Sequence, residues 1–175
     1  MPEQSRLNTT SRKIRPLTPS DLEEVVDLSL LAWEPVFVSF ENILGTEIFD
    51  LLYRPQWRAA QAASVRRNCL ADGAEAFVLT TGDDVVVGFV VLQQDEDESL
   101  GVIEMIAVHP EHQRRGHARA LMEFAIQRLR DQGLDLISVG TGGDPGHAPA
   151  RALYEAVGFA GVPLVNYYMA SPVAQ

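Results

Sequence analysis

The chain has little cysteine, few basic residues and no long apolar run. Cys69 is the single cysteine among 175 residues, which excludes an intramolecular disulfide and a cysteine-rich zinc site and suits a reducing cytoplasm. No run of about 18 apolar residues occurs, and residues 1–11 are polar, without the apolar core of a signal peptide. These absences favour a cytoplasmic protein with no membrane-spanning segment.

The balance of charge is acidic. Fourteen Lys and Arg residues stand against 24 Asp and Glu, a formal net charge of −10. Because attraction to phosphates dominates affinity for nucleic acids, this balance disfavours such a partner and suits a cationic small molecule or a basic peptide. The length and the 46% of hydrophobic residues fit one globular domain over 12–175, preceded by a flexible N-terminus over 1–11.

Hydrophobic spacing and turn residues predict the order of strands and helices. Strands are expected at 13–18, 74–82, 85–94, 101–110, 134–141 and 162–170, and helices from 18 onward, from 55 to 72, from 114 to 132 and from 148 to 158. The segment 34–50 mixes aromatics with Pro35 and Gly45, which predicts short helices and turns. This order indicates a single α/β (α+β) domain with a mixed, mostly antiparallel sheet flanked by helices.

The stretch from Val108 to Ala118 lies between a predicted strand and the start of the clearest helix. A helix start offers unpaired N–H groups and the positive end of the helix dipole, which together favour an anion. Gly116 allows close approach of the backbone, and three arginines add local positive charge to an acidic protein: Arg114, Arg115 and Arg119. A polyanionic ligand is the sharper interpretation, and a structural helix cap is the simpler one.

The stretch MIAVHPEHQRRGHARALM resembles the signature of GNAT-type N-acetyltransferases, V-x-P-x-x-Q/R-x-x-G-x-G/A, through Gln113, Gly116 and Ala118. A second block, Pro149 to Phe159, looks like the A-x-x-L-Y-E-x-x-G-F segment of the same family. The resemblance covers roughly 85–169 and implies a GNAT-like fold. It also implies acetyl-CoA as cosubstrate and transfer of its acetyl group to an amine.

The resemblance also implies how acetyl-CoA is held. Backbone groups of one strand would pair with the pantetheine arm: Ile106, Ala107 and Val108. Groups of the loop and helix start would surround the pyrophosphate: Arg114, Arg115, Gly116, His117, Ala118 and Arg119. One departure is His147, which stands where the family often carries an Asn that contacts the cofactor arm. The glycine-rich segment 140–146 before it is interpreted as a flexible connection, since no Lys-Ser/Thr helix start follows it.

Acetyl transfer to an amine needs a neutral nucleophile and a proton for the departing thiolate. The resemblance implies Glu104 as general base, with a sheet-face residue paired to an arginine as the alternative. It implies Tyr154 as general acid, with packing against the sulfur end of the cofactor as the alternative. Strand alternation places Glu104, Ile106 and Val108 on one face and Met105 and Ala107 on the other.

The acceptor is the least determined part of the prediction. Trp33, Glu34 and Phe37 lie where the family builds its acceptor pocket, although the aromatics could equally be core residues. The expected acceptor is a primary amine of a small molecule or peptide, acetylated by direct transfer because Cys69 lies away from both motifs. Alternatives are a non-catalytic acyl-CoA sensor and, against the charge balance, a toxin acting on charged tRNA. No metal site is expected, and a homodimer is left open.

Overall fold

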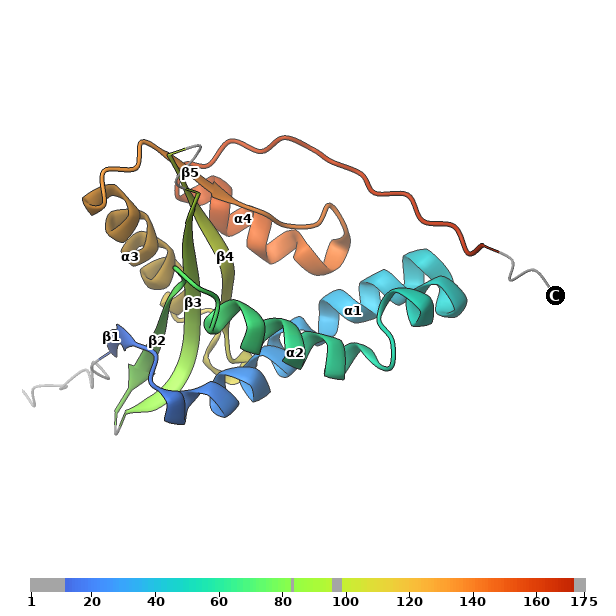
Figure 1. The fold of residues 1–175 in the computed structure, drawn as a ribbon. Coiled ribbons are helices and arrows are strands. Elements are labelled where there is room, and N and C mark those ends of the chain that lie inside the picture. The colour runs from blue at the N-terminus through green and yellow to red at the C-terminus, as the bar shows by residue number, and fades with distance from the viewer. Residues whose placement is uncertain (1–11, 83, 96–98, 172–175) are drawn as a thin grey trace, which may run out of the picture.

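The structure is a computed structural model that describes residues 12–82, 84–95 and 99–171 (Figure 1). The elements follow in the order β1 (Arg12–Pro16), α1 (Leu22–Leu52), α2 (Trp57–Cys69), β2 (Glu75–Thr81), β3 (Val85–Asp95), β4 (Leu100–Val108), α3 (His117–Asp131), β5 (Leu136–Val139) and α4 (Ala148–Ala156). Short 3-10 turns precede α1, α3 and α4 at Pro19–Asp21, Pro110–His112 and Pro145–His147. The flexible N-terminus predicted over 1–11 lies outside the described residues.

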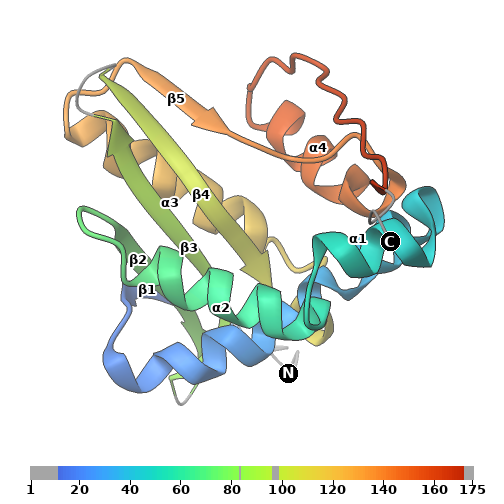
Figure 2. The ribbon, with the colours of Figure 1, turned by 45° about the vertical axis from the view of Figure 1, so that its right-hand side comes forward.

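The five strands form one mixed sheet in the order β1-β2-β3-β4-β5. All neighbours are antiparallel except β4 and β5, which run parallel. Alternate side chains of β2 enter different cores: Phe77 and Leu79 pack toward α3 and α4, and Val78 packs toward α1 and α2. Helices therefore cover both faces of the sheet (Figure 2), which confirms the predicted fold class. None of the helices in the described ranges has both the length and the apolar character that crossing a bilayer demands.

The first long helix differs from its prediction. The short helices and turns expected over 34–50 are wrong, because α1 continues through Pro35 as far as Leu52, broken in conformation only at Gly45, where φ is 75° and ψ is 156°. Proline disfavours a helix interior locally. The tertiary packing outweighs that local cost here, since Phe37 and Phe49 are buried in one aromatic cluster with Phe40, Tyr53 and Trp57.

Strands β4 and β5 separate after a short paired stretch. Leu100 to Ile103 pair with Leu136 to Val139, and beyond Ile103 the described part of β4 pairs with β3 alone. Glu104 is an extra residue in β4, because Val91 pairs with Met105 while Leu92 pairs with Ile103. Such bulges bend a strand and interrupt the ladder. The two strands therefore diverge (Figure 2), and the edge of β4 that faces β5 is open from Glu104 onward.

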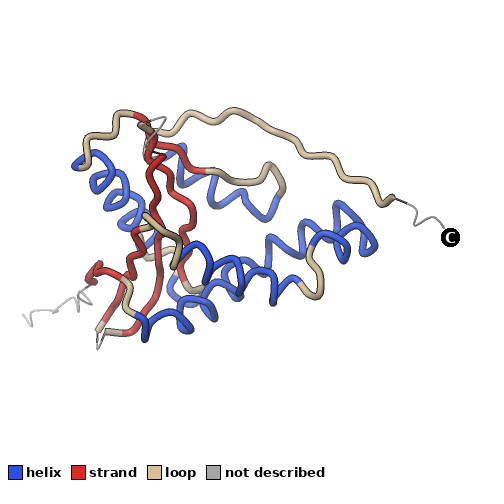
Figure 3. Tube along the Cα trace, viewed as in Figure 1, coloured by secondary structure: helices blue, strands red, loops and turns tan. Residues whose placement is uncertain are grey.

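The strand predicted at 162–170 is absent from the described chain. These residues form an extended segment without regular secondary structure, which runs from the end of α4 toward the far end of α1 (Figure 3). Val162 is 81% exposed and Tyr167 is 91% exposed. Strand propensity is realised only when a neighbouring strand supplies hydrogen bonds and packing, and within the described chain β5, the nearest edge strand in sequence, does not pair with this segment.

Candidate active site

The loop between β4 and α3 has a fixed, strained backbone. Arg114 and Gly116 both have positive φ, 60° and 80°, and Gly116 is the N-cap of α3. Helix α3 consequently begins at His117 and not at Arg114 as predicted. The side-chain amide of Gln113 donates a hydrogen bond to the carbonyl of Val108 at 3.0 Å, which ties the loop back to the end of β4. The unpaired N–H groups at the start of α3 are thus presented next to this loop.

Positive charge gathers around this loop. Arg114 and Arg115 are exposed and have no carboxylate partner in the described ranges, whereas Arg119 pairs with Glu123 at 3.3 Å. Arg12 of β1 also reaches the loop, since a Cβ on Gly116 would lie 3.6 Å from its Nη1 atom. Arg12 was missed by the sequence analysis because no sequence pattern relates it to a loop so distant in the chain.

His117 is a buried histidine with an unsatisfied ring nitrogen. Its Nδ1 atom is buried and has no hydrogen-bond partner. Burial lowers the pKa of His117, and the nearby charges of Arg12, His112 and Arg115 lower it further. A neutral ring and an orphaned polar atom inside a basic loop fit a site completed by an anion with several oxygen acceptors.

The open edge of β4 continues the site. Ile106 and Val108 pack toward α3, and Met105 and Ala107 pack toward α1 and α2, as the alternation predicts. Glu104 is exposed at the bulge, and no hydrogen bond or ion pair to the rest of the described chain holds its carboxylate, so the predicted alternative of pairing with an arginine is not found. Main-chain groups on this edge are free to pair with an extended ligand that carries amides.

Tyr154 lies on α4 in the core cluster shared with α3 and β4. It is 9% exposed, and its ring lies 6.2 Å from that of Phe159. Burial raises the pKa of Tyr154 to about 12. The phenol therefore stays protonated at neutral pH and can donate a hydrogen bond or a proton to a group that becomes negative beside it.

The glycine-rich loop before α4 is packed and not a flexible connection. Asp144 binds the Nδ1 atom of His147, and Arg151 donates hydrogen bonds to the carbonyls of Gly142 at 2.5 Å and Asp144 at 2.8 Å. A Cβ on Gly146 would come within 2.7 Å of the Cα of Val36 in α1. This carboxylate–histidine pair was missed by the sequence analysis, which noted only the substitution at His147.

The three residues predicted to contact the acceptor lie in different environments in the structure. Trp33 packs 6.3 Å from Phe89 in the core, and Phe37 stacks on Trp57 at 4.3 Å. Glu34 is exposed and binds Arg58 at 2.5 Å. The two aromatic side chains therefore match the alternative of core residues, and Glu34 is the exposed one of the three, with its carboxylate bound by Arg58.

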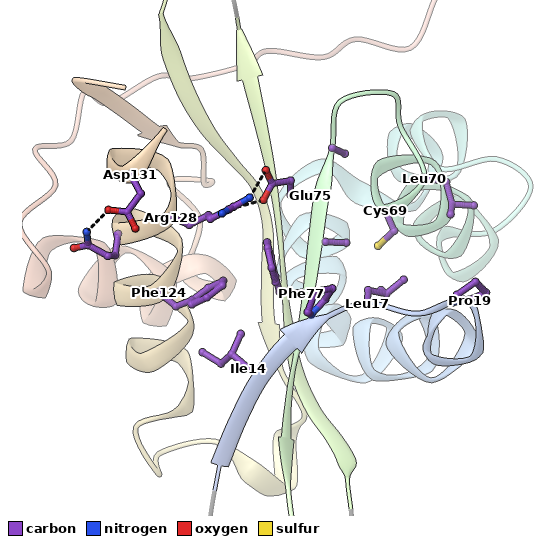
Figure 4. Close-up of a pocket in the computed structure, with 14 residues that line it drawn as sticks. Ile14, Leu17, Pro19, Cys69, Leu70, Glu75, Phe77, Phe124, Arg128 and Asp131 are labelled. Atoms are coloured by element: carbon purple, nitrogen blue, oxygen red, sulfur yellow. Dashed lines mark hydrogen bonds and ion pairs between the residues drawn. The ribbon is translucent and has the colours of Figure 1, made fainter. Parts of the chain in front are cut away.

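A cavity of about 780 Å³ lies elsewhere, at the β1 edge between α2 and α3 (Figure 4). Phe77 and Phe124 form part of its apolar wall, and Arg128 binds Glu75 at 2.7 Å on its rim. Cys69 also lines it, and burial raises the pKa of this thiol to about 11. Neither the loop after β4 nor Tyr154 lines this cavity. In the described part of the chain, no three His, Cys, Asp or Glu residues gather to hold a metal ion.

Comparison with known proteins gives one family. A family model described as the acetyltransferase (GNAT) family matches residues 44–159. Mycothiol acetyltransferase of Rhodococcus opacus is 27% identical over 157 residues, which cover 83% of this chain and 50% of that protein. The [ribosomal protein bS18]-alanine N-acetyltransferase of Salmonella typhimurium is 36% identical over 96 residues, 54% of this chain and 60% of that protein. The chain thus spans about half the length of the first of these curated relatives.

Solved structures share the architecture. The PaiA N-acetyltransferase of Thermoplasma acidophilum, solved in complex with coenzyme A, matches with a TM-score of 0.63 at 16% identity, over 86% of this chain and 90% of that one. The ribosomal-protein-S18-alanine N-acetyltransferase of Escherichia coli matches with a TM-score of 0.61 at 22% identity, over 85% of this chain and 77% of that one. At these identities the similarity concerns the fold, and it confirms the predicted architecture.

Proposed function

The chain belongs to the acetyltransferase (GNAT) family, and we propose that it transfers an acetyl group from acetyl-CoA to a primary amine of a small molecule or peptide. One observation carries the proposal: a loop with positive φ at Arg114 and Gly116, at the start of α3, directly follows the strand whose edge is open beyond Ile103. A ligand with a pyrophosphate joined to an extended amide arm would use both features at once.

The residues available fit such a ligand. Backbone N–H groups between Arg114 and Arg119 would hold the pyrophosphate, with the guanidinium of Arg12 and the ring of His117 beside them. Main-chain groups of Ile106 would pair with the arm, since Ala107 is paired with Phe89 of β3 and the carbonyl of Val108 already accepts a hydrogen bond from Gln113. When bound, acetyl-CoA supplies an activated thioester whose acetyl group is transferred.

The chain's own residues then move protons. An alkylamine with an ordinary pKa of about 10.4 is mostly ammonium at pH 7, and freeing its lone pair costs about 4 to 5 kcal/mol. Glu104, exposed at the bulge, is the proton acceptor that the family motif offers, directly or through water. Tyr154 stays protonated because burial raises its pKa, so it is the donor to the departing thiolate. Cys69 is buried, which favours direct transfer over a cysteine-bound intermediate.

The acceptor class follows from charge and from the relatives. The formal net charge of −10 attracts cationic amines. The relatives' names include a mycothiol enzyme and a ribosomal-protein alanine enzyme, so a small molecule and a peptide N-terminus both stay within the proposal. Glu34 is the predicted substrate residue best suited to a cation, which would take the place of Arg58 at its carboxylate. Trp33 and Phe37 would support this site from the core behind it.

A panel of amines tests the proposal. Acetyl-CoA is mixed with monoamines, polyamines, aminoglycosides and short peptides, and free thiol is followed in wild type and in Gly116→Glu. The substitution adds a negative charge and a side chain at φ 80°, so amine-dependent release is expected to disappear. Gly73→Glu is the matched control, since Gly73 has φ 74° and open space around it. Absence of acetyl-CoA binding in the wild type would overturn the assignment of acetyl-CoA as the cosubstrate.

The rival function is a non-catalytic acyl-CoA sensor. Replacing Tyr154 by Phe removes the proton donor while keeping a ring in the same pocket. An enzyme should lose at least about 100-fold in turnover with acetyl-CoA affinity kept, whereas a sensor should show no turnover to lose in either form. Calorimetry for binding and thiol release for turnover separate the two.

We also propose that residues 12–175 act as one cytoplasmic GNAT-like domain and that a second copy covers the apolar segment 162–169. Several large side chains there are exposed: Val162, Leu164, Val165, Tyr167 and Met169. Extended, apolar and unpaired segments are typical of chain association. Light scattering should give the mass of a dimer, and Leu164→Asp together with Tyr167→Asp should reduce it to that of a monomer. A wild-type monomer would contradict this assembly.

A further inference from the structure

Asp144 and His147 form a built carboxylate–histidine pair between β5 and α4. The side chain of Asp144 is 5% exposed and that of His147 is 16% exposed. One oxygen of Asp144 binds the Nδ1 atom of His147, and the other accepts a hydrogen bond from the backbone N–H of Gly146 at 2.9 Å. Ser39 of α1 also hydrogen-bonds to Asp144. The carboxylate therefore has a full set of partners.

The surroundings hold the pair in place. Gly142 has no room for a Cβ, which would lie 2.6 Å from the Nδ1 atom of His147. Gly146 has none either, because its Cβ would approach the carbonyl oxygen of Pro35 to 2.9 Å. Arg151 binds two carbonyls of the loop. A histidine whose rotamer is fixed by a carboxylate on a rigid loop is preorganised for proton transfer.

The carboxylate also fixes which ring nitrogen is free. Burial disfavours the charged form of Asp144, but hydrogen bonds from His147 and Ser39 outweigh it, so the pKa of Asp144 is lowered and the group stays ionised. An ionised carboxylate accepts the proton on Nδ1 and leaves the lone pair on Nε2 of His147. Nε2 has no hydrogen-bond partner in the described ranges. His147 stands where the family resemblance puts an Asn that contacts the cofactor arm, and an imidazole, unlike that amide, can take up a proton.

The position of the pair relates it to Tyr154. His147 is the N-cap of α4, and Tyr154 follows seven residues later on the same helix face, about 10 Å along the axis. The loop that carries the pair begins where β5 has left β4, and it crosses to α1, so that the start of α4 lies beside α1 (Figure 2). On the α1 side, the ring of His147 lies 5.6 Å from that of Phe40.

We infer that His147, oriented by Asp144, takes the proton from the acceptor ammonium at Nε2, and that Asp144 is a positioning residue. The inference rests on the proposed function and moves the role of base from Glu104 to His147. Overall, ammonium and thioester become amide, thiol and one free proton. As the C–N bond forms and the C–S bond breaks, nitrogen loses two protons. One leaves through His147 to solvent, and the other replaces the proton that Tyr154 gives to sulfur.

Other groups around the pair can titrate or carry charge. Tyr53, which follows α1, has its pKa raised by burial and then by Tyr168 and Asp144. Tyr168 comes from the C-terminal segment, and Arg151 of α4 faces the loop carbonyls. Ser39 of α1 is uncharged. Because its pKa is raised, the phenol of Tyr53 is protonated at pH 7, where the loss is first measured.

The test is His147→Asn, because an amide can still donate and accept hydrogen bonds but cannot take up a proton near neutral pH. The amine from the panel with the fastest thiol release is the acceptor. At pH 7 we expect kcat to fall about 100- to 10,000-fold, with the affinity for acetyl-CoA unchanged by calorimetry. The loss should shrink as the pH rises toward 10, because a growing share of the amine is already neutral in solution. Asp144→Asn should show a smaller loss with the same trend.

Controls separate this inference from the proposed function. Asp72→Asn replaces an exposed carboxylate that follows α2, outside both the pair and the loop before α3, and circular dichroism with thermal melting checks that each variant folds. A His147→Asn enzyme with kcat within about threefold of wild type, or a loss that stays constant with pH, overturns the inference while the proposed function stands. If Glu104→Gln shows the loss that recovers at high pH and His147→Asn does not, Glu104 is the base. A wild-type enzyme that is inactive on every amine overturns both the inference about His147 and the proposed function.

Discussion

The side-chain amide of Gln113 donates a hydrogen bond to the main-chain carbonyl of Val108 at 3.0 Å. This contact joins the end of β4 to the loop that begins α3, so the open strand edge and the loop proposed to bind the pyrophosphate are held in one fixed relation. A ligand that bridges the two features meets a preorganised surface, which lowers the cost of ordering the loop on binding.

Gln113→Ala should therefore weaken acetyl-CoA binding without removing the acid or the base. A hydrogen bond of this kind contributes about 0.5 to 1.5 kcal/mol, so we expect the KM for acetyl-CoA to rise about 3- to 10-fold while kcat changes little. Gln127→Ala is the matched control, since Gln127 binds Asp131 at 2.7 Å on the exposed side of α3. An equal effect of both substitutions would contradict the role of Gln113.

Arg12→Gln tests the cation that β1 brings to the same loop. Removing a charge near the phosphates should weaken acetyl-CoA binding about 2- to 10-fold at low salt, and the difference from wild type should shrink as salt screens the attraction. Lys13→Gln removes the neighbouring charge of the same strand. Calorimetry at two ionic strengths measures both variants, and a loss that is equal for both, or independent of salt, would argue against a phosphate contact by Arg12.

The parts predicted well from sequence are those with local causes. Gly116 and the spacing around it predict the junction of strand, loop and helix that the structure has, with Gly116 at positive φ at the start of α3, because a helix start and a residue that tolerates positive φ are neighbours in the chain. The apolar stripe that α3 buries, and the placement of Ile106 and Val108 on one face of β4, follow in the same way from the spacing of residues that are close in the chain. These patterns need no knowledge of distant segments.

The parts that failed depend on contacts between distant segments. Pro35 indicated an interruption, but burial of Phe37 keeps the helix continuous. The glycines near Asp144 suggested flexibility, whereas their lack of a Cβ is what allows close packing against α1. Strand propensity over 162–170 found no partner edge. Arg12 has no sequence signal at all, since only the sheet brings it to Gly116.

The pH dependence of stability should report on a buried ion pair at the start of α1. Asp21 is 6% exposed and receives hydrogen bonds from two nitrogens of Arg15, at 2.7 and 3.0 Å. The hydrogen bonds from Arg15 hold the pKa of Asp21 well below its usual range, against the effect of burial. Its stabilisation is therefore present above the unfolded pKa of about 3.9 and is lost as the pH falls through the folded value.

Asp21→Asn should lower the free energy of unfolding by about 2 to 3 kcal/mol at pH 7, which corresponds to roughly 5 to 10 °C in Tm. Thermal melting between pH 7 and pH 2.5 should show wild type and variant converging in acid. Asp84→Asn is the control, because Asp84 binds the same Arg15 at 3.0 Å with an exposed side chain, and a much smaller loss is expected there. A gap between wild type and Asp21→Asn that widens in acid would contradict the assignment.

Gly146→Ala tests whether the rigidity of the loop before α4 matters for turnover. The new methyl group would lie 2.7 Å from the Cα of Val36 and 2.9 Å from the carbonyl oxygen of Pro35, and backbone atoms of a helix cannot move aside cheaply. We expect a loss of about 1 to 3 kcal/mol in stability together with a fall in kcat, because Asp144 and His147 must shift with the loop. Gly143→Ala is the matched control, since nothing lies within 4 Å of a Cβ at that position. If Gly146→Ala lowers Tm but leaves kcat intact, the packing supports the fold alone and turnover does not depend on the placement of His147.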